Sequence, residues 1–503
     1  MDFSDLMKLL PVAALCLLSA FPLFAGEWVN LFNGKDLAGF VQRGGKATYA
    51  VEDGAVVGTT APNTPNSFLC TEKDYGDFVL ELEFKVDPRM NSGIQFRSES
   101  KPDYKSGQVH GYQFEIDPAD RAWTAGIYDE GRRAWLAPLE TNDAARFAFK
   151  QNEWNKARVE AIGDQLRTFL NGVPAASLKD GMTPKGFIAL QVHGIGKNDT
   201  QMQVRWRNIR LLENPSKADL TPEVQAPKAP ASLVAEGAEV KLLQGGFKFT
   251  EGPALAPDGR IFFTDIPNNR IHIYDPATGK TSVHRENTGG ANGLIFTPTG
   301  ALLACEMKAR KVTREANGEI KTIVEKVGGK KVNQSNDVDL DGKGGYYFTD
   351  PNYGQKDDIQ MEKECVYYVD RGGKVTQVID DCLKPNGIVL SLDKKTLYVG
   401  DNGSNKVRAY DVQDNGTVKN GRDFAKMAEG QATGGDGMTI DQFGNVYVTA
   451  QEFVWVFDPT GKEVTKIKVP ENPANCTFGR DNMLYITAKT GFYGVKMNVS
   501  GRR

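Results

Sequence analysis

The chain has 503 residues, with 61 Lys and Arg against 64 Asp and Glu and a formal net charge of −3. That length is enough for two or three domains that each bury a core. The balanced charge and the lack of a Lys- or Arg-rich stripe argue against a nucleic-acid partner. The 53 Gly residues, many of them in Asp-Gly, Asn-Gly and Gly-Gly steps, indicate β structure with many turns.

Residues 1–25 have the pattern of a secretory signal peptide. Lys8 precedes an uncharged run over 9–24, and Ala25 offers a small residue at the cleavage point. The alternative is an uncleaved anchor helix, but this run contains two prolines and is shorter than the roughly 20 residues that a span needs. Since no other apolar run could cross a membrane, we expect an exported protein, periplasmic or extracellular, without a stable membrane span.

Five cysteines remain once the signal peptide is removed: Cys70, Cys305, Cys365, Cys382 and Cys476. An odd number at wide spacing is not a disulfide framework, and no Cys-x-x-Cys pair suggests zinc. Cys365 and Cys382 flank a predicted hairpin, so they could pair if the register places them opposite each other.

Residues 26–213 form the first predicted domain. The stretch 78–86, FVLELEFKV, places five apolar side chains on one face. Similar alternation runs over 92–98, 112–116, 154–162, 165–170 and 186–192. Long alternating strands with few helical patterns predict an antiparallel β-sandwich. Residues 214–238 follow as an interdomain linker, because 213–235 holds four prolines and no periodicity.

A residue pair that opens with a polar side chain recurs through residues 239–503. The pairs are Glu251-Gly252, Asn292-Gly293, Asn336-Asp337, Asn386-Gly387, Asp436-Gly437 and Asn475-Cys476, at intervals of 41, 44, 50, 50 and 39 residues. Most lead into a short apolar segment, a turn and a second strand, as in LAPDGRIFFTD over 255–265. Six units of this period predict a six-bladed β-propeller. An open meander would leave exposed edges and would not explain the recurring pair.

The first residue of each pair is predicted to lie at the mouth of the propeller channel, because the innermost strands ring that channel. All six side chains carry oxygen, two of them as carboxylates, which suits a hard cation such as Ca²⁺ or Mg²⁺. A single Asn-Gly before a strand is more often turn chemistry than a metal ligand. Six such positions at blade register favour the metal site.

The repeat resembles the gluconolactonase family, which includes senescence-marker and luciferin-regenerating-type proteins. The resemblance rests on TEGPALAPDG (250–259), NQSNDV (333–338), FTDPNYG (348–354), PNGIVLS (385–391), GDGMTIDQFGNVYVTA (435–450) and NCTFG (475–479). It implies a six-bladed propeller with one central divalent ion held by Glu251, Asn386 and Asp436. Asn336 would be a fourth ligand or a substrate contact, and Asn292 a substrate contact. Ca²⁺ is the first candidate, with Mg²⁺, Mn²⁺ or Zn²⁺ as alternatives.

The chemistry expected at this site is lactone hydrolysis. A bound ion would polarise the lactone carbonyl and stabilise the oxyanion that forms on attack. Asp436 is the candidate that orients or deprotonates water. His272 and His284 lie away from the blade openings and no Gly-x-Ser-x-Gly occurs, so a Ser-His-Asp hydrolase is disfavoured. The remaining alternative is a structural ion in the channel.

In the first domain, polar residues gather on strands near its centre. Alternation over HGYQFEIDP (110–118) puts Gln113, Glu115 and Asp117 on one face. Arg97 ends a neighbouring predicted strand, and His193 follows another. A solvated outer face is the simpler interpretation of the pattern. A concave sugar-binding face is the alternative.

These segments, with LFNGKDLAGF (31–40), EWNKARVEAIGDQLRTFLNGV (153–173) and WRNIRLLE (206–213), resemble the 3-keto-disaccharide hydrolase family. The resemblance implies a concanavalin-like jelly roll that cleaves 3-keto-glycosides. Glu115 and Asp117 are then the acid/base candidates, with Arg97, Gln113 and His193 as sugar contacts. Because the ketone acidifies the neighbouring C–H, elimination followed by hydration and direct displacement both remain open.

The sequence therefore predicts an all-β protein, a jelly-roll sandwich followed by a six-bladed propeller. Its expected function is metal-dependent lactone hydrolysis in the propeller, with 3-keto-glycoside cleavage or binding in the sandwich. Its expected partners are small sugar lactones and keto-sugars; no protein partner can be inferred. The alternative is a non-catalytic carbohydrate-binding protein with a structural Ca²⁺.

Overall fold

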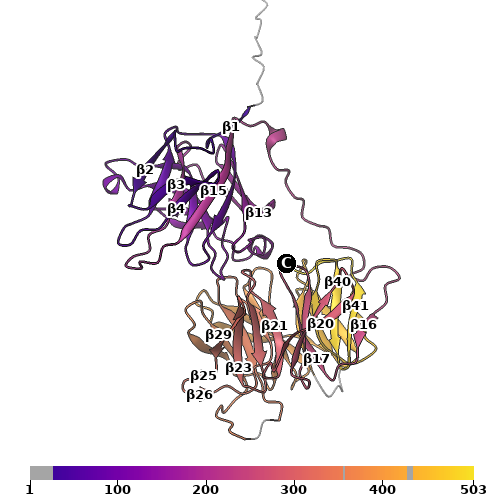
Figure 1. Ribbon diagram of the computed structural model, residues 1–503. Coiled ribbons are helices and arrows are strands. Elements are labelled where there is room, and N and C mark those ends of the chain that lie inside the picture. The colour runs from indigo at the N-terminus through magenta and orange to yellow at the C-terminus, as the bar shows by residue number, and fades with distance from the viewer. Residues whose placement is uncertain (1–25, 355–356, 428–433, 503) are drawn as a thin grey trace, which may run out of the picture.

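The structure is a computed structural model that describes residues 26–354, 357–427 and 434–502. The predicted signal peptide lies outside the described residues. Figure 1 shows two β bodies, an N-terminal sandwich and a C-terminal propeller, joined by an extended segment. In the part of the chain that the structure describes, no helix has the length and apolar character to cross a membrane.

The sandwich is built from two antiparallel sheets. The larger contains β1 (Trp28–Asn30), β3 (Thr48–Glu52), β4 (Ala55–Thr59), β6 (Phe78–Val86), β11 (Asn155–Ile162), β12 (Gln165–Leu170), β13 (Val173–Lys179) and β15 (Gln203–Glu213). The smaller has the order β10 (Ala134–Ala137), β9 (Ile127–Glu130), β8 (His110–Ile116), β7 (Ser92–Glu99), β14 (Phe187–Val192), β5 (Ser67–Thr71), β2 (Phe40–Gly44). Three short helical segments accompany them: η1 (Lys105–Gly107), α1 (Asp143–Arg146) and η2 (Lys217–Asp219).

Alternation along the strands builds the sandwich core. In β6 the apolar side chains of the predicted stretch are buried while the intervening charged ones are only partly buried. Phe84 of β6 packs edge-on against Phe114 of β8, with ring centroids 6.2 Å apart, so the two sheets meet across one apolar layer. The predicted sandwich is confirmed.

The propeller consists of six four-stranded antiparallel sheets. The first two blades are β17 (Thr250–Leu255), β18 (Ile261–Asp265), β19 (Arg270–Asp275), β20 (Lys280–Glu286), and β21 (Ala291–Phe296), β22 (Leu302–Glu306), β23 (Lys311–Ala316), β24 (Glu319–Val324). The next two are β27 (Val338–Leu340), β28 (Tyr346–Asp350), β29 (Cys365–Val369), β30 (Val375–Ile379), and β31 (Pro385–Leu390), β32 (Thr396–Asp401), β33 (Lys406–Val412), β34 (Val418–Lys426). The fifth is β35 (Met438–Ile440), β36 (Val446–Ala450), β37 (Phe453–Phe457), β38 (Glu463–Lys468).

The sixth blade closes the ring with strands from both ends of the repeat. The C-terminal strands β39 (Pro473–Phe478), β40 (Met483–Ala488) and β41 (Gly491–Lys496) pair with β16 (Lys241–Gly245), which precedes the first blade. Because β16 supplies the outermost strand of this blade, the start of the repeat is hydrogen-bonded to its end and the ring is closed. A small hairpin, β25 (Lys326–Val327) and β26 (Lys330–Lys331), lies outside the blades. The predicted six blades are confirmed.

The glycines of the recurring pairs let adjacent blades approach each other. Gly387 N–H donates to the carbonyl of Asp436 in the next blade at 3.0 Å, and a Cβ on Gly387 would lie 2.0 Å from that oxygen. Gly293 makes the same bond to Asn336, at 2.7 Å. The glycine thus serves inter-blade packing, while the residue before it faces the channel mouth.

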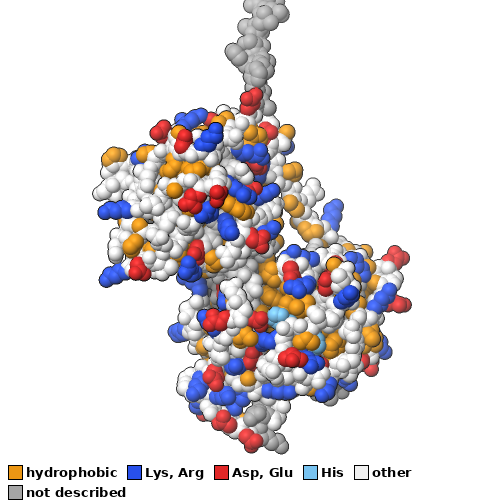
Figure 2. Space-filling model, viewed as in Figure 1, with side chains coloured by type: hydrophobic (Ala, Val, Ile, Leu, Met, Phe, Trp, Pro, Cys, Tyr) orange, Lys and Arg blue, Asp and Glu red, His pale blue; other side chains and the backbone are white. Residues whose placement is uncertain are grey.

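The sandwich rests on the propeller face where the innermost strands end. Trp123 Nε1 donates to the carbonyl of Gly342, which lies in the turn between β27 and β28, at 2.9 Å. Lys394, in the turn between β31 and β32, ion-pairs with Asp143 of the sandwich at 3.1 Å. The channel mouth, where these strands begin, is on the opposite face. On the surface shown in Figure 2, Lys and Arg are interspersed with Asp and Glu over both bodies.

The suggested Cys365–Cys382 pairing is wrong, because all five described cysteines are free and buried. Cys365 lies in β29 opposite Asp350. Cys382 comes after β30 and contacts the Tyr410 hydroxyl, with Sγ and the oxygen 3.4 Å apart. The two thiols therefore belong to different side-chain clusters.

Candidate functional site

A cavity of about 430 Å³ opens at the mouth of the propeller channel. Its lining includes five of the six predicted blade-opening side chains: Glu251, Asn292, Asn336, Asn386 and Asp436. The first four are buried and Asp436 is partly exposed. The sixth, Asn475, lies deeper and lines the channel below. The structure thus brings together the three predicted metal ligands and both predicted substrate contacts.

Within the described residues, neither carboxylate of this cavity has a Lys or Arg partner. Burial, then the charge of Asp436, raises the pKa of Glu251 to about 8. Burial, then the charge of Asp337, raises the pKa of Asp436 to about 7. Among the described residues no Lys or Arg contributes to either shift. Neighbouring carboxylates that are shielded from water favour either protonation or a counter-charge, and a bound cation would supply the counter-charge.

The donor set fits a hard divalent cation. The described residues contain no group of three His, Cys, Asp or Glu side chains arranged around one metal position. An ion at the mouth would therefore depend on the amide oxygen of Asn386 as well as on Glu251 and Asp436. Carboxylate and amide oxygens are ligands that Ca²⁺ and Mg²⁺ accept.

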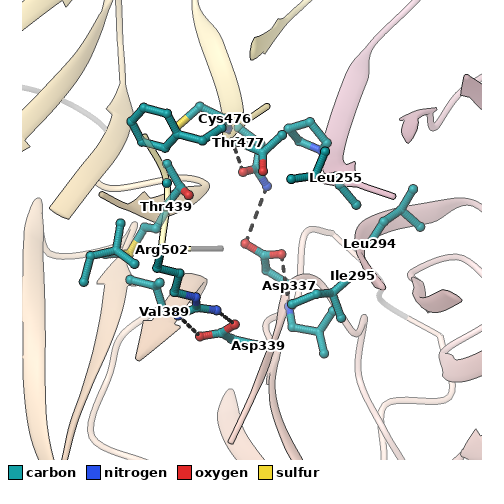
Figure 3. Close-up of a pocket in the computed structure, with 18 of the residues that line it drawn as sticks. Leu255, Leu294, Ile295, Asp337, Asp339, Val389, Thr439, Cys476, Thr477 and Arg502 are labelled. Carbon is teal, nitrogen blue, oxygen red and sulfur yellow. Dashed lines mark hydrogen bonds and ion pairs between the residues drawn. The ribbon is translucent and has the colours of Figure 1, made fainter. Parts of the chain in front are cut away.

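Two residues that the sequence interpretation did not select also belong to this site. The Tyr353 hydroxyl accepts a hydrogen bond from Asn386 Nδ2 at 2.6 Å, which orients the amide. Asp337 occupies the glycine position of its pair and points into the channel, where Asn475 Nδ2 lies 3.5 Å from Asp337 Oδ2 (Figure 3). Burial, then the charge of Glu251, raises the pKa of Asp337 to about 8. The sequence signal that could have identified Asp337 is that it stands where most of the recurring pairs have glycine.

The far end of the channel is closed by Arg502. Its guanidinium bonds to Asp339 in the channel wall and borders a cavity of about 80 Å³ below Asp337 (Figure 3). Arg502 also pairs with Asp143 of the sandwich, with Nε and Oδ2 3.5 Å apart. The cavity at the channel mouth lies on the side away from the sandwich.

In the sandwich, Gln113 and Glu115 lie together on the outward face of β8. Glu115 is only 5% exposed and accepts hydrogen bonds from Asn91 Nδ2 and Gln113 Nε2, both at 2.6 Å. Gln113 in turn accepts from Gln95 of β7. Burial raises the pKa of Glu115 to about 7, although the two amide donors oppose the shift. A carboxyl group with this pKa can exchange protons near neutrality.

Two other predicted residues are held in structural roles. Asp117 accepts a hydrogen bond from Arg121 Nε at 2.6 Å, so its carboxylate is tied up in an ion pair. Arg97 has φ of 45° at a bulge in β7 and turns away from the face that carries Gln113 and Glu115. Its guanidinium, 0% exposed, donates to three backbone carbonyls and to Asp77. Arg97 as a sugar contact is therefore corrected.

His193 is exposed at the rim of the same sheet, beyond the end of β14. Its Nδ1 is hydrogen-bonded to the carbonyl of Gly194 at 2.8 Å, and Nε2 lies on the other side of the ring from that contact. Its role as a sugar contact stays a prediction.

Comparisons with known proteins agree with both halves of this arrangement. Residues 249–490 match the family described as the SMP-30/gluconolactonase/LRE-like region. The match spans the propeller, so this part of the chain is similar to that family. Residues 27–212 match the 3-keto-alpha-glucoside-1,2-lyase-like domain.

Similar proteins align with the gluconolactonase-like propeller. A gluconolactonase of Zymomonas mobilis is 28% identical over 296 residues, which cover 52% of this chain and 82% of the relative. A pentonolactonase of Haloferax volcanii is 28% identical over 253 residues, 48% of this chain and 81% of its own. The solved structure of a Xanthomonas campestris gluconolactonase superposes with a TM-score of 0.50 at 27% identity, covering 53% of this chain and 91% of its own.

Proposed function

We propose that the propeller hydrolyses sugar lactones with the help of one divalent cation. The convergence of Glu251, Asn386 and Asp436 on one cavity carries this proposal. When bound, the cation would polarise the lactone carbonyl and stabilise the negative charge that develops on its oxygen. The lactonase names of the similar proteins support the substrate class.

The residues of the cavity have different roles in this reaction. Glu251 and Asn386 are buried and hold the cation, the amide being oriented by Tyr353. Asp436 is the more accessible carboxylate and accepts a proton from the attacking water. Asn292 and Asn336, also in the lining, are placed to bind sugar hydroxyls.

A panel of aldonolactones, assayed after chelation and with Ca²⁺, Mg²⁺, Mn²⁺ or Zn²⁺ added back singly, tests the proposal. We expect hydrolysis that is lost on chelation and restored by at least one ion. Failure to open any lactone with every ion present would leave the alternative, a carbohydrate-binding protein with a structural Ca²⁺.

For the sandwich we propose cleavage of 3-keto-glycosides at the face that carries Glu115. The buried carboxyl group with two amide donors supports this activity over a simply solvated surface. The test is release of the aglycone from a 3-keto-glucoside. Affinity for the sugar without cleavage would favour a binding module.

We also propose that the protein is exported and that residues 1–25 are removed. The uncharged run over 9–24 with Ala25 after it supports this proposal. Amino-terminal sequencing of protein from the native host should begin at Gly26. A chain that still begins at Met1 would contradict it.

A further inference from the structure

Strand β9 places a second carboxylate on the face that carries Glu115. Gln113 of β8 pairs with Tyr128 of β9 across the sheet. Because side chains alternate along strands, Gln113 and Glu115 on β8 share one face with Tyr128 and Glu130 on β9. The two glutamates therefore lie on either side of the Gln113–Tyr128 pair.

Glu115 and Glu130 are held in the same way. Glu115 accepts from the side-chain amides of Asn91 and Gln113. Glu130 accepts from Asn66 Nδ2 at 3.1 Å and from Gln191 Nε2 at 3.4 Å. Among the described residues neither carboxylate belongs to an ion pair, which distinguishes both from Asp117 with its Arg121 partner.

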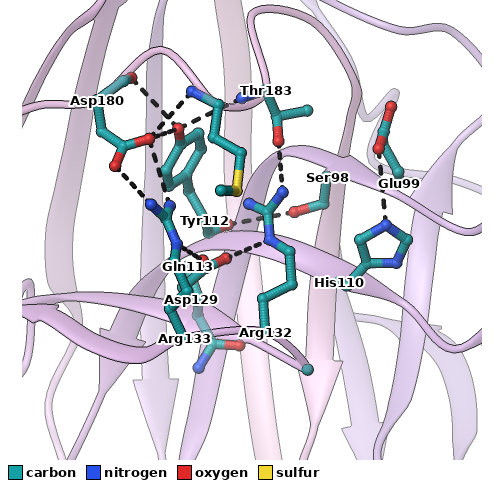
Figure 4. A network of polar contacts seen from close by, with 12 residues as sticks. Ser98, Glu99, His110, Tyr112, Gln113, Asp129, Arg132, Arg133, Asp180 and Thr183 are labelled. Atoms are coloured by element: carbon teal, nitrogen blue, oxygen red, sulfur yellow. Dashed lines mark hydrogen bonds and ion pairs between the residues drawn. The ribbon is translucent and has the colours of Figure 1, made fainter. Parts of the chain in front are cut away.

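The opposite face of β9 carries a carboxylate that is held in ion pairs, in contrast to Glu115 and Glu130. Asp129, 0% exposed, bonds to both Arg132 and Arg133 (Figure 4). Arg133 continues to Asp180, which also accepts from the Tyr112 hydroxyl. This network fixes β9 against the loop at Asp180 and so holds the orientation of Tyr128 and Glu130 on the other face.

Two aromatic side chains lie on the same face as the glutamates. Tyr128 and Trp135 of β10 meet edge to face, with ring centroids 5.3 Å apart, and both rings are partly exposed. After burial, the charges of Glu130 and then Glu115 raise the pKa of Tyr128, so both carboxylates act on one phenol. Gln191 is 1% exposed, and its Oε1 has no hydrogen-bond partner in the described structure. Such an acceptor, on the side chain that donates to Glu130, suits a sugar hydroxyl.

We propose that Glu115 and Glu130 are the base and acid of the sandwich site, on either side of Tyr128, with Gln191 accepting from a sugar hydroxyl. This assignment rests on the 3-keto-glycoside cleavage proposed above. It replaces Asp117 by Glu130 as the second carboxyl group.

The reaction step balances without an added reactant. Glu115, as the carboxylate, takes the proton from the carbon between the ketone and the anomeric carbon. The electron pair of that C–H bond forms the new C=C bond as the anomeric C–O bond breaks. The leaving oxygen receives the proton of the Glu130 carboxylic acid, so the products are an unsaturated keto-sugar and an alcohol.

The test compares two probes on the full-length protein, methyl and p-nitrophenyl 3-keto-α-glucoside. Glu115→Gln should slow both by about 100-fold or more, because both need the base. Glu130→Gln should slow the methyl glycoside by about 100-fold but the p-nitrophenyl glycoside by less than about 10-fold, since nitrophenolate leaves without a proton. Glu83→Gln, on the other sheet and paired with Arg207, is the matched control and should leave both rates unchanged.

The leaving-group dependence is a result that a merely structural role would not produce. The assignment is overturned if Asp117→Asn shows this dependence in place of Glu130→Gln, or if Glu130→Gln slows neither probe. If the wild-type protein cleaves neither probe, the proposed glycoside cleavage itself fails and the assignment fails with it. Melting temperatures of all variants no more than about 2 °C below that of the wild type would show that the fold is kept.

Discussion

Arg502 joins the two bodies of this protein through Asp143. Its Nε lies 3.5 Å from Asp143 Oδ2 in the sandwich, while its NH1 donates to Asp339 of the propeller at 3.0 Å. Lys394 pairs with the same Asp143. Arg146 also pairs with Asp143, at 2.7 Å, so three cations and two carboxylates meet where the channel ends, and the C-terminal segment lies between the bodies (Figure 1).

Replacing Arg502 by Gln should destabilise the protein by about 3 kcal/mol, because Asp339 would remain buried with its main cation removed. The same change weakens the contact between the sandwich and the propeller. We therefore expect calorimetry to resolve two thermal transitions, one for each body, that overlap more closely in the wild type. The control is Arg260→Gln, which removes an exposed ion pair with Asp258 and should change stability by less than about 0.5 kcal/mol. Equal effects of the two changes would contradict the role given to Arg502.

Asp337 and Asp339 should respond in opposite directions to replacement by Asn. Asp337 faces two other carboxylates, and its pKa is raised; Asp339 faces Arg502, which lowers its pKa. In chelated protein at pH 8, Asp337→Asn should therefore raise the melting temperature and Asp339→Asn should lower it. Thermal unfolding without added metal measures both, and a shift of the same sign in the two variants would refute this account.

Gly387→Ala should cost about 2 kcal/mol or more, because the new Cβ would lie 2.0 Å from the carbonyl oxygen of Asp436. Lactone hydrolysis should fall too, since Asn386 and Asp436 are the residues displaced. Gly181→Ala is the matched control, with its Cβ 3.7 Å from the nearest atom and no unusual φ. Chemical denaturation and the lactone assay report the two effects separately.

Glu251→Ala and Asp436→Asn should differ in what they lose. Glu251→Ala removes a buried ligand, so we expect metal affinity and hydrolysis to fall together. Asp436→Asn keeps an oxygen ligand, so hydrolysis should fall by about 100-fold or more while some metal binding remains. Calorimetric metal titration beside the lactone assay separates these outcomes; full hydrolysis by a metal-bound Asp436→Asn protein would exclude Asp436 as the base.

Glu115 should make the sandwich less stable as the pH rises. Its pKa is about 7 in the fold against an ordinary value of 4.5, so the folded state holds the proton more tightly. Stability is full below about pH 4.5, declines up to pH 7 and is constant above it, a loss of at most about 3 kcal/mol. Glu115→Gln should therefore raise the melting temperature at pH 8 relative to wild type, and by less at pH 5. An equal shift at both values would show that Glu115 has an ordinary pKa.

The sequence by itself determined the fold class of each half and the number of blades. The alternation of apolar and polar residues predicted the observed bounds of β6, Phe78–Val86, because burying one face of a strand fixes which of its residues are apolar. The recurring pair predicted six blades and placed Glu251, Asn386 and Asp436 at the mouth of the channel. It could do so because each blade packs its first strand against the next blade with the same local sequence.

Only the tertiary structure decided which polar side chains act together. A bulge with positive φ reverses Arg97, and a short loop gives Asp117 its Arg121 partner, neither of which strand alternation shows. Glu130 reaches Gln191 and Asn66, 61 and 64 residues away in the chain, through the curvature and register of one sheet. Arg502 meets Asp143 because two separately folded bodies touch there. Such contacts depend on the position of distant segments, which local sequence patterns do not encode.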